Sequence, residues 1–553
     1  MAKAGKRTNP IILQAGMTIG TNAAEMDDDF LLPCFVRYPP VDLCLNIASR
    51  GMVVDGRTGS GKTAILRYIA SQVSNSAAVD PTEMAMSYVT NSDVLRFLQA
   101  IGADLDLTFQ VLWKHVLCIE FIRLRFKVDS EASSNFVFTN ILSRFTRDDR
   151  KKRSLKYLKD WEGKFWITMD QNIKELTEKV ENQVKAEFGA EIERFKAGGQ
   201  YEKRLSTDKK SELVARIRKI IHADQLAELA GVVDMLAEIE REDKHHFDET
   251  SYYIMIDRLD ENWVDVSIRF KLIRALIETL KAFRRIPNLE VLVALRSDVL
   301  ERVIQETRDL SFQREKLDDY FVHLSWDKRL LRELVDSRIQ NLFKKQYSQG
   351  AIHFDDVFPY NVGNVSPFDY MIDRTLMRPR DIIAFVNQCL RAAEGTYEVT
   401  GQAIRKAEIE FSRIRRDALT EEWQSAFPTI RRVLDYLGQN QKPIIALTEF
   451  NDADELALNI ASDDRFVLDP LYTVAKDHVE QSRSPAVPFL KELVVMLYRV
   501  GAVGVKLRNG NRYLYSHIDE PLLPTAQITD DTKVRIHPML WGSYRIQIRH
   551  DAP

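Results

Sequence analysis

Cysteine is scarce in this chain, and long apolar runs are absent. Only four cysteines occur among 553 residues, and no two of them form a C-x-x-C pair. This spacing excludes a disulfide framework or a zinc finger and fits a reducing compartment. No apolar run approaches the roughly 20 residues that a membrane-spanning helix needs. We therefore expect a cytoplasmic protein that has no membrane partner.

Neither sign of charge dominates the sequence. The chain has 78 lysines and arginines against 81 aspartates and glutamates, with a formal net charge of -3. Such a balance creates no overall field that attracts nucleic acid, so any contact with DNA has to be local. Internal repeats and low-complexity tracts are also lacking, which excludes a solenoid. The length instead predicts several globular domains.

Short apolar runs alternate with helical patterns. Runs over 51–56, 252–256 and 289–295 each close on a glycine or lead into a charged residue, and 320–324 is a further candidate strand. Helical spacing separates them, for example over 267–285. Alternating strands and helices predict an α/β fold with a parallel sheet covered on both faces. Ligands of such sheets collect at the carboxyl ends of the strands.

A glycine-rich loop follows the first apolar run. The sequence GRTGSGKT over 56–63 fits the pattern G-x-x-x-x-G-K-[ST] and leads into helical spacing over 63–70. In this pattern backbone amides cradle phosphates, the lysine reaches the β and γ phosphates, and the threonine hydroxyl ligates Mg²⁺. The predicted nucleotide-binding residues are Gly56, Gly59, Ser60, Gly61, Lys62 and Thr63.

Acidic residues follow the second apolar run. Asp257 ends that run, so we predict that it holds Mg²⁺ together with Thr63. The next residue is Arg258, and a base that activates water must therefore come from further along. Asp260 and Glu261 are the acidic residues available, with Asp260 slightly favoured. The alternative is that both cap the helix that follows.

Three segments carry a resemblance to a known family. Residues 254–261, IMIDRLDE, resemble the acidic strand of the STAND and KAP branch of P-loop ATPases, and 295–298, LRSD, are similar to its sensor strand. Residues 376–386 resemble its lid helix. The resemblance implies ATP as the nucleotide and covers most of the chain outside a long insert.

The same resemblance implies roles for single residues. Arg296 would read the γ-phosphate, and bidentate guanidinium geometry suits that task. Arg380 would reach nucleotide from the lid, with Arg378 an equally suitable candidate and a salt bridge the plain alternative. His537 follows a short strand and would contact the diphosphate, as a winged-helix histidine does in STAND proteins. The alternative is a packed histidine at a strand end.

These patterns predict an order of domains. Apolar stripes over 158–188 and 213–236 predict two long inserted helices, while an apolar helix near 489–497 and the Asn509-Gly510 turn predict a winged helix. The predicted segments are the N-terminal part of a P-loop NTPase domain (1–126), an inserted helical hairpin (127–246), the C-terminal part of the NTPase domain (247–326), a helical lid (327–420) and a winged-helix-like domain (421–553).

Two functions compete at this point. The favoured one is a Mg²⁺-dependent ATPase that acts as a switch between ATP and ADP states, with an unidentified protein partner or effector and assembly as a homo-oligomer. The resemblance allows a role in bacterial antiviral defence or signalling. The alternative is an ATP-dependent DNA-binding initiator or loader that uses the basic wing of Lys506, Arg508 and Arg512.

Overall fold

The computed structural model divides into two compact units. The sheet unit comprises 37–57 and 62–325, and the C-terminal unit comprises 1–36, 58–61 and 326–553. Each unit is described by itself. The structure describes residues 11–49, 51–84, 86–103, 105–128, 131–144, 148–161, 169–197, 205–223, 225–243, 250–306, 318–344, 351–481, 486–508 and 510–546.

The sheet unit is built on a five-stranded parallel sheet with the order β2-β3-β4-β1-β5. This confirms the predicted α/β fold with a parallel sheet. Every residue of β3 is buried, as expected for a strand covered on both faces. The strands are β1 (Val53–Gly56), β2 (Ser76–Val79), β3 (Tyr252–Ile256), β4 (Leu289–Arg296) and β5 (Phe321–His323).

Strand β2 escaped the sequence analysis. Its residues Ser76, Ala77 and Ala78 are small and only partly buried or exposed, so they form no apolar run. Parallel pairing with β3 holds the strand in the sheet, and Ala77 lies opposite Ile254 in this pairing. Edge strands need less apolar character than central ones because one side lacks a neighbour.

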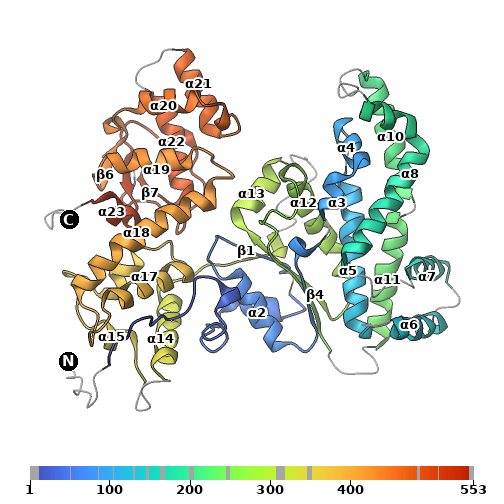
Figure 1. Ribbon diagram of the computed structural model, residues 1–553, viewed down its shortest axis with the longest axis horizontal. Coiled ribbons are helices and arrows are strands. Elements are labelled where there is room, and N and C mark those ends of the chain that lie inside the picture. The colour runs from blue at the N-terminus through green and yellow to red at the C-terminus, as the bar shows by residue number, and fades with distance from the viewer. Residues whose placement is uncertain are drawn as a thin grey trace. The chain divides into compact units, whose positions relative to one another are not determined.

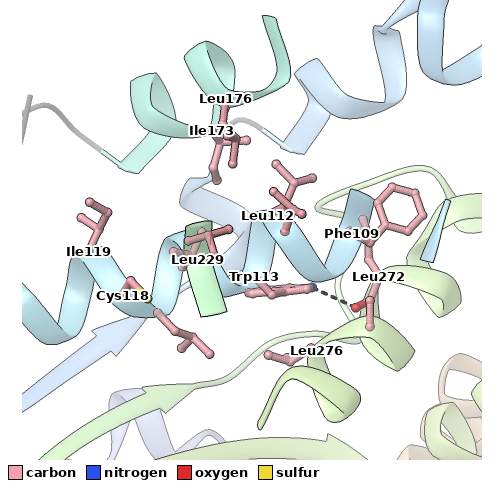
Figure 2. Packing of buried hydrophobic residues seen from close by; sticks show 14 of the residues in the cluster. Phe109, Leu112, Trp113, Cys118, Ile119, Ile173, Leu176, Leu229, Leu272 and Leu276 are labelled. Carbon is pink, nitrogen blue, oxygen red and sulfur yellow. Dashed lines mark hydrogen bonds between the residues drawn. The ribbon is translucent and has the colours of Figure 1, made fainter. Parts of the chain in front are cut away.

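Helices of the sheet unit form one continuous core with the sheet. The ring nitrogen of Trp113 in α5 donates a hydrogen bond of 2.9 Å to the carbonyl of Leu272 in α12, which joins the two helices (Figure 2). Trp113 is fully buried, so this bond satisfies a polar group that water cannot reach. The helices on the sheet are α1 (Pro39–Leu45), α2 (Lys62–Gln72), α5 (Asp106–Phe126), α12 (Val266–Phe283) and α13 (Ser297–Glu306).

The predicted helical hairpin is a larger helical bundle. Helices α5, α8 and α11 run side by side (Figure 1). The stripe predicted over 158–188 is not one helix, because α7 ends at Asp160 and α8 begins at Met169. The break predicted at 198–199 lies outside the described residues. The bundle comprises α3 (Met86–Asn91), α4 (Asp93–Ala100), α6 (Glu131–Arg144), α7 (Asp149–Asp160), α8 (Met169–Ala197), α10 (Thr207–Ala223) and α11 (Gln225–Asp243).

The C-terminal unit is largely helical. Helices α17 and α18 pack through stacked rings of Phe385 and Phe411, whose centroids are 4.3 Å apart. The N-terminal segment joins this unit where the amide of Leu13 donates to the carbonyl of Thr396 at 2.9 Å. Its first helices are α14 (Lys328–Lys344), α15 (Phe354–Val357), α16 (Pro367–Ile372), α17 (Pro379–Ala392) and α18 (Gly401–Trp423).

The end of the C-terminal unit combines helices with a small antiparallel sheet of order β6-β8-β7. Its strands are β6 (Ile444–Ala446), β7 (Val503–Lys506) and β8 (Lys533–Ile536). Its helices are α19 (Ile430–Gln439), α20 (Ala453–Ala461), α21 (Pro470–Glu480), α22 (Val487–Val500) and α23 (Trp541–Tyr544).

The hairpin predicted around 509–510 is reduced to one antiparallel bridge. Val505 meets Leu514 only in an isolated bridge, and β7 pairs along its length with β8. Val534 and Ile536 of β8 are fully buried, so burial of this apolar pair selects β8 for the central position. Asn509 itself lies outside the described residues.

Across the described ranges, no helix combines the length and the apolar character that crossing a membrane requires.

Candidate functional site

The carboxyl ends of the central strands bring the predicted residues of the sheet unit together. Gly56 at the end of β1 lies in register with Arg296 at the end of β4. Ile256, the last residue of β3, pairs with Val293, so Asp257 follows at the same edge. Parallel strands end on one side of a sheet, and this edge therefore gathers residues that are far apart in sequence.

The loop between β1 and α2 needs its glycines. Gly59 and Gly61 have φ angles of +81° and +99°, a region that residues with a side chain rarely adopt. Residues 58–61 belong to the C-terminal unit, in which a Cβ on Gly59 would lie 2.8 Å from the Cβ of Arg380. In the same unit the ring nitrogen of Trp326 donates to the carbonyl of Ser60 at 2.8 Å.

Lys62 begins helix α2 with its ammonium turned back to the loop. Its Nζ donates to the carbonyls of Gly56 at 2.8 Å and Arg57 at 3.2 Å. Burial lowers the pKa of this ammonium, and Arg296 adds to that effect, while Asp260 and Asp257 oppose it. A partly buried cation at a helix N-terminus is suited to an anionic ligand.

Thr63 and Asp257 meet directly. The hydroxyl of Thr63 donates to Oδ2 of Asp257 at 2.7 Å, although 194 positions separate them. The amide of Arg258 donates to the other carboxylate oxygen at 2.8 Å. Burial raises the pKa of Asp257, and these two hydrogen bonds together with Lys62 oppose the rise. A nearby divalent cation would stabilise the ionised form of this partly buried carboxylate.

The turn after Asp257 is held by arginines. Arg258 adopts a left-handed φ of 61° and pairs with Asp80 at 3.1 Å. Arg269 donates to the carbonyls of Asp260 at 3.2 Å and Glu261 at 3.0 Å. Helix α12 begins only at Val266, so the two acidic residues are too far upstream to cap it.

Arg296 links the ends of β3 and β4. Its guanidinium forms two hydrogen bonds with the carboxylate of Asp298, at 2.9 and 2.8 Å, and its Nη1 donates to Asp260 at 3.2 Å. The side chain of Arg296 is only 16% exposed. Asp260 is therefore held by an arginine that would itself face an anionic ligand at this edge.

Glu261 has different surroundings. Its side chain is half exposed and lies 3.6 Å from Arg258, a looser ion pair than that of Asp260. Desolvation raises the pKa of Glu261, Arg258 opposes this, and Asp260 adds to the rise. A higher pKa makes a carboxylate a better proton acceptor near neutral pH.

A polar cluster at the ends of β1 and β5 was not found in the sequence. Asp55 of β1 is buried and accepts hydrogen bonds from the hydroxyl of Ser297 and from Nδ1 of His323, each at 2.8 Å. Asp55 lies inside an apolar run, where a single carboxylate does not by itself indicate a functional site. Its position one residue before Gly56 was the only available clue.

The two lid arginines have distinct surroundings. Arg378 is 3% exposed and donates to the carboxylates of Asp381 and Glu422, each at 3.1 Å, and to the carbonyl of Thr58 at 2.8 Å. The side chain of Arg380 donates to the carbonyl of Asn22 at 3.0 Å and forms no salt bridge within the described ranges. Arg378 therefore braces the unit.

The electrostatic surroundings of Arg380 favour an anion. Burial lowers the pKa of its guanidinium, and the positive charges of Arg378 and Arg415 lower it further. Asp381 and Glu422 oppose this effect. A cation near other cations is stabilised by a negatively charged ligand. Of the two arginines, Arg380 is thus the better candidate for binding phosphate.

His537 has a packing role within the C-terminal unit. Its Nδ1 accepts a hydrogen bond of 3.1 Å from the amide of Met539, and its ring packs against Tyr515 and His517. The side chain is buried, with 3% of the residue exposed. These contacts agree with the packed histidine at a strand end, and a contact with diphosphate stays a prediction.

The fold and the edge residues define an α/β protein with a five-stranded parallel sheet and a largely helical C-terminal region. Residues 329–420 match the family model of a FunZ-associated C-terminal helical domain. This match spans α14 through most of α18 and lies within the predicted segment 327–420. A search among curated proteins found no match to the chain.

Proposed function

We propose that the chain is a Mg²⁺-dependent ATPase of the STAND and KAP type that works as a nucleotide-controlled switch. The observation that carries this proposal is the contact of 2.7 Å between the Thr63 hydroxyl and the Asp257 carboxylate. A loop of the G-x-x-x-x-G-K-[ST] pattern supplies the hydroxyl, and the strand β3 supplies the carboxylate. These are the two protein ligands that Mg²⁺ has in P-loop NTPases.

The residues of the loop and the end of β3 suit both Mg²⁺ and the phosphates of a nucleotide. Hydroxyl and carboxylate oxygens suit Mg²⁺, which takes one or two protein ligands and completes its shell with phosphate and water. Among the described residues, no group of three or more His, Cys, Asp and Glu is placed to hold a metal alone. Lys62 and the amides of 59–61 would bind the phosphates, and bound Mg²⁺ would neutralise charge on them.

Hydrolysis would use the acidic turn. Glu261 or Asp260 would orient and deprotonate the attacking water, and Arg296 would donate to the γ-phosphate. Because Arg296 already holds Asp260 at 3.2 Å, a phosphate that attracts Arg296 would also change the surroundings of Asp260. Nucleotide binding would then be coupled to the state of the turn.

The C-terminal region supports a winged helix. Helix α19, strand β6, helices α20 to α22 and strands β7 and β8 follow one another, with β8 between the other two strands. The predicted wing is electrostatically weak, because Arg508 pairs with Asp531 at 3.3 Å and Arg512 pairs with Asp519. This neutralisation favours a switch, with bacterial defence or signalling as its setting, over a DNA loader.

The proposal is tested by binding of ATP. Isothermal titration calorimetry with MgATP should detect binding by the wild type and not by Lys62→Ala, which loses the phosphate-binding ammonium. Lys476→Ala, at an exposed position of α21, is the matched control and should bind like the wild type. Failure of the wild type to bind any adenosine polyphosphate with Mg²⁺ present, or unchanged binding by Lys62→Ala, contradicts the proposal.

A further inference from the structure

An arginine-lined cleft lies within the C-terminal unit. It has a volume of about 1300 Å³ and lies between the helical segment 362–416 and the chain end 535–546. Helix α18 packs against α23 beside it (Figure 1). Among the described residues of the lining, Asp373, Glu408 and Glu410 contribute carboxylates. The cationic lining residues are Arg374, Arg405, Arg413, Arg416, Arg535 and Arg545.

Half of these arginines form no salt bridge with any residue that the structure describes. Arg374 pairs with Glu408 at 2.7 Å, Arg413 pairs with Glu410 at 2.6 Å, and Arg416 has a longer pair with Asp417. Arg405, Arg535 and Arg545 form no salt bridge with any residue that the structure describes. The cleft therefore has an excess of positive charge that an anionic ligand would neutralise.

Aromatic rings hold two of the guanidinium groups in place. That of Arg374 lies 3.4 Å from the ring centroid of Tyr370 and 5.7 Å from that of Trp541. That of Arg535 lies 5.4 Å from the ring centroid of Trp541. Cation–π contacts order a guanidinium without cancelling its charge, so that of Arg535 remains available to phosphate, while Arg374 is buried and paired with Glu408.

The dimensions of the cleft favour an extended ligand. Arg405, Arg413 and Arg416 lie on one stretch of α18, and the eleven-residue span between the first and last corresponds to roughly 16 Å along a helix. The volume also exceeds the roughly 300–1,000 Å³ that is usual for small-molecule sites. A ligand with several phosphates in a row matches this row of arginines better than a ligand with a single phosphate does.

Apolar side chains distinguish the ligand further. Val365 and Ile409 line the same cleft and are 40% and 60% exposed. A simple polyanion gives such side chains nothing to contact, whereas unpaired bases have apolar faces. Bases of a duplex are stacked inside it and offer only their edges. We propose that the cleft binds single-stranded nucleic acid, through its phosphates and the faces of its bases.

The test is fluorescence anisotropy with labelled single strands of about 12 nucleotides, a length within the usual range of single-strand sites. Oligo-dT and oligo-rU represent single-stranded DNA and single-stranded RNA. A duplex of equal length is compared with both. We expect a single strand to bind at least ~10-fold more tightly than the duplex, with affinity falling as salt rises. Binding of dT alone, rU alone or both supports the proposal and identifies the source.

Charge reversal localises the site. Arg405→Glu and Arg545→Glu alter exposed positions, and each should weaken single-strand binding by about 10-fold. Each should also make the slope of log affinity against log salt shallower by about 0.7 for every phosphate that the variant no longer binds. Circular dichroism checks the folding of each variant. If one variant does not fold, the other still tests the inference. Arg329→Glu, at a position of α14 that is 74% exposed and outside the cleft, should bind like the wild type.

Two further variants separate this inference from the other proposals. Lys62→Ala should keep single-strand binding, because the cleft uses no residue of the phosphate loop, so the inference stands even if ATP does not bind. Arg508→Glu, in the predicted wing, should also leave it unchanged. The inference is overturned if no single strand binds, if the duplex binds equally well, or if Arg508→Glu weakens binding while both cleft variants do not.

Discussion

Asp260 and Glu261 are neighbours in the sequence and differ in what surrounds them. Arg296 holds Asp260 at 3.2 Å, whereas Glu261 is half exposed and only loosely paired with Arg258. At the scale of single residues, we therefore propose Glu261 as the general base of the proposed ATPase, because Arg296 already engages Asp260, which the sequence analysis slightly favoured.

The first prediction compares the two residues by kinetics. Glu261→Gln should lower kcat for ATP hydrolysis by roughly 10²–10⁴-fold and leave MgATP binding nearly unchanged, because a general base contributes about that much. Asp260→Asn should have the smaller effect on kcat. Single-turnover hydrolysis and calorimetry measure both quantities. The reverse order of the two effects would show that Asp260 is the base.

Glu290 of β4 carries a pH dependence of stability. It is 2% exposed, and its Oε1 has no hydrogen-bond partner among the residues described. Burial raises its pKa from 4.5 to about 8, with Arg284 opposing the rise. The folded state therefore binds a proton more tightly than the unfolded state does. The free energy of unfolding should fall as pH rises from about 4.5 to about 8.

The second prediction removes this titration with Glu290→Gln, which keeps the size of the side chain and loses its charge. Between pH 5.5 and 8.5 the melting temperature of the wild type should fall relative to that of the variant, because a shifted pKa of this size corresponds to a few kcal/mol. Differential scanning fluorimetry measures both. Glu193→Gln, 76% exposed in the same unit, is the control, and parallel curves for all proteins would contradict the prediction.

At the scale of elements, the start of α17 joins a bracing arginine to one that is available for a ligand. Arg378 precedes the helix and lies in a buried network with Asp381 and Glu422, while the guanidinium of Arg380 in the first turn donates to a carbonyl. Asp381 is fully buried and pairs with Arg415 at 3.3 Å as well, and removal of Arg378 would break two buried ion pairs, those with Asp381 and Glu422.

The third prediction separates the two functions of this turn. Arg378→Ala should destabilise the protein by about 3–5 kcal/mol, the usual cost of breaking a buried ion pair. Arg380→Ala should change stability little and weaken MgATP binding. Thermal unfolding and calorimetry give the two measurements. If Arg378→Ala folds as well as the wild type and no longer binds ATP, the two assignments are exchanged.

The strands and helices also show which elements a sequence pattern can predict. Strands β1, β3 and β4 were predicted because each is a compact apolar run. Strand β2 was missed because its small residues depend on pairing with β3. The apolar spacing over 158–188 continues across the end of α7, so periodicity alone joined two helices into one.

At the scale of the whole molecule, the proposed switch requires nucleotide to change the arrangement of its units. Residues 58–61 of the loop belong to the C-terminal unit, and Lys62 and Thr63 belong to the sheet unit. The chain therefore passes from one unit to the other within the predicted phosphate-binding loop, and we expect nucleotide state to act on that segment.

The fourth prediction is a nucleotide-dependent change of shape. Small-angle scattering and size-exclusion chromatography with mass measurement should give different radii for the ADP form and the form with a non-hydrolysable ATP analogue. Lys62→Ala should give one radius under both conditions, and duplex DNA should alter neither result. Equal radii for the two wild-type forms, with binding of both nucleotides shown by calorimetry, would rule out the switch and leave an ATPase.

The sequence by itself determined the glycine-rich loop after β1, the Asp257 strand end and the parallel α/β sheet, because each is encoded by residues close together in the chain. Only the tertiary structure decided what depends on distant residues. It joined Asp55 to Ser297 and His323 and assigned different surroundings to Arg378 and Arg380. It also gathered the arginines of α18 and the chain end into one cleft. Burial and pairing act between atoms in space, and local patterns in a sequence do not record them.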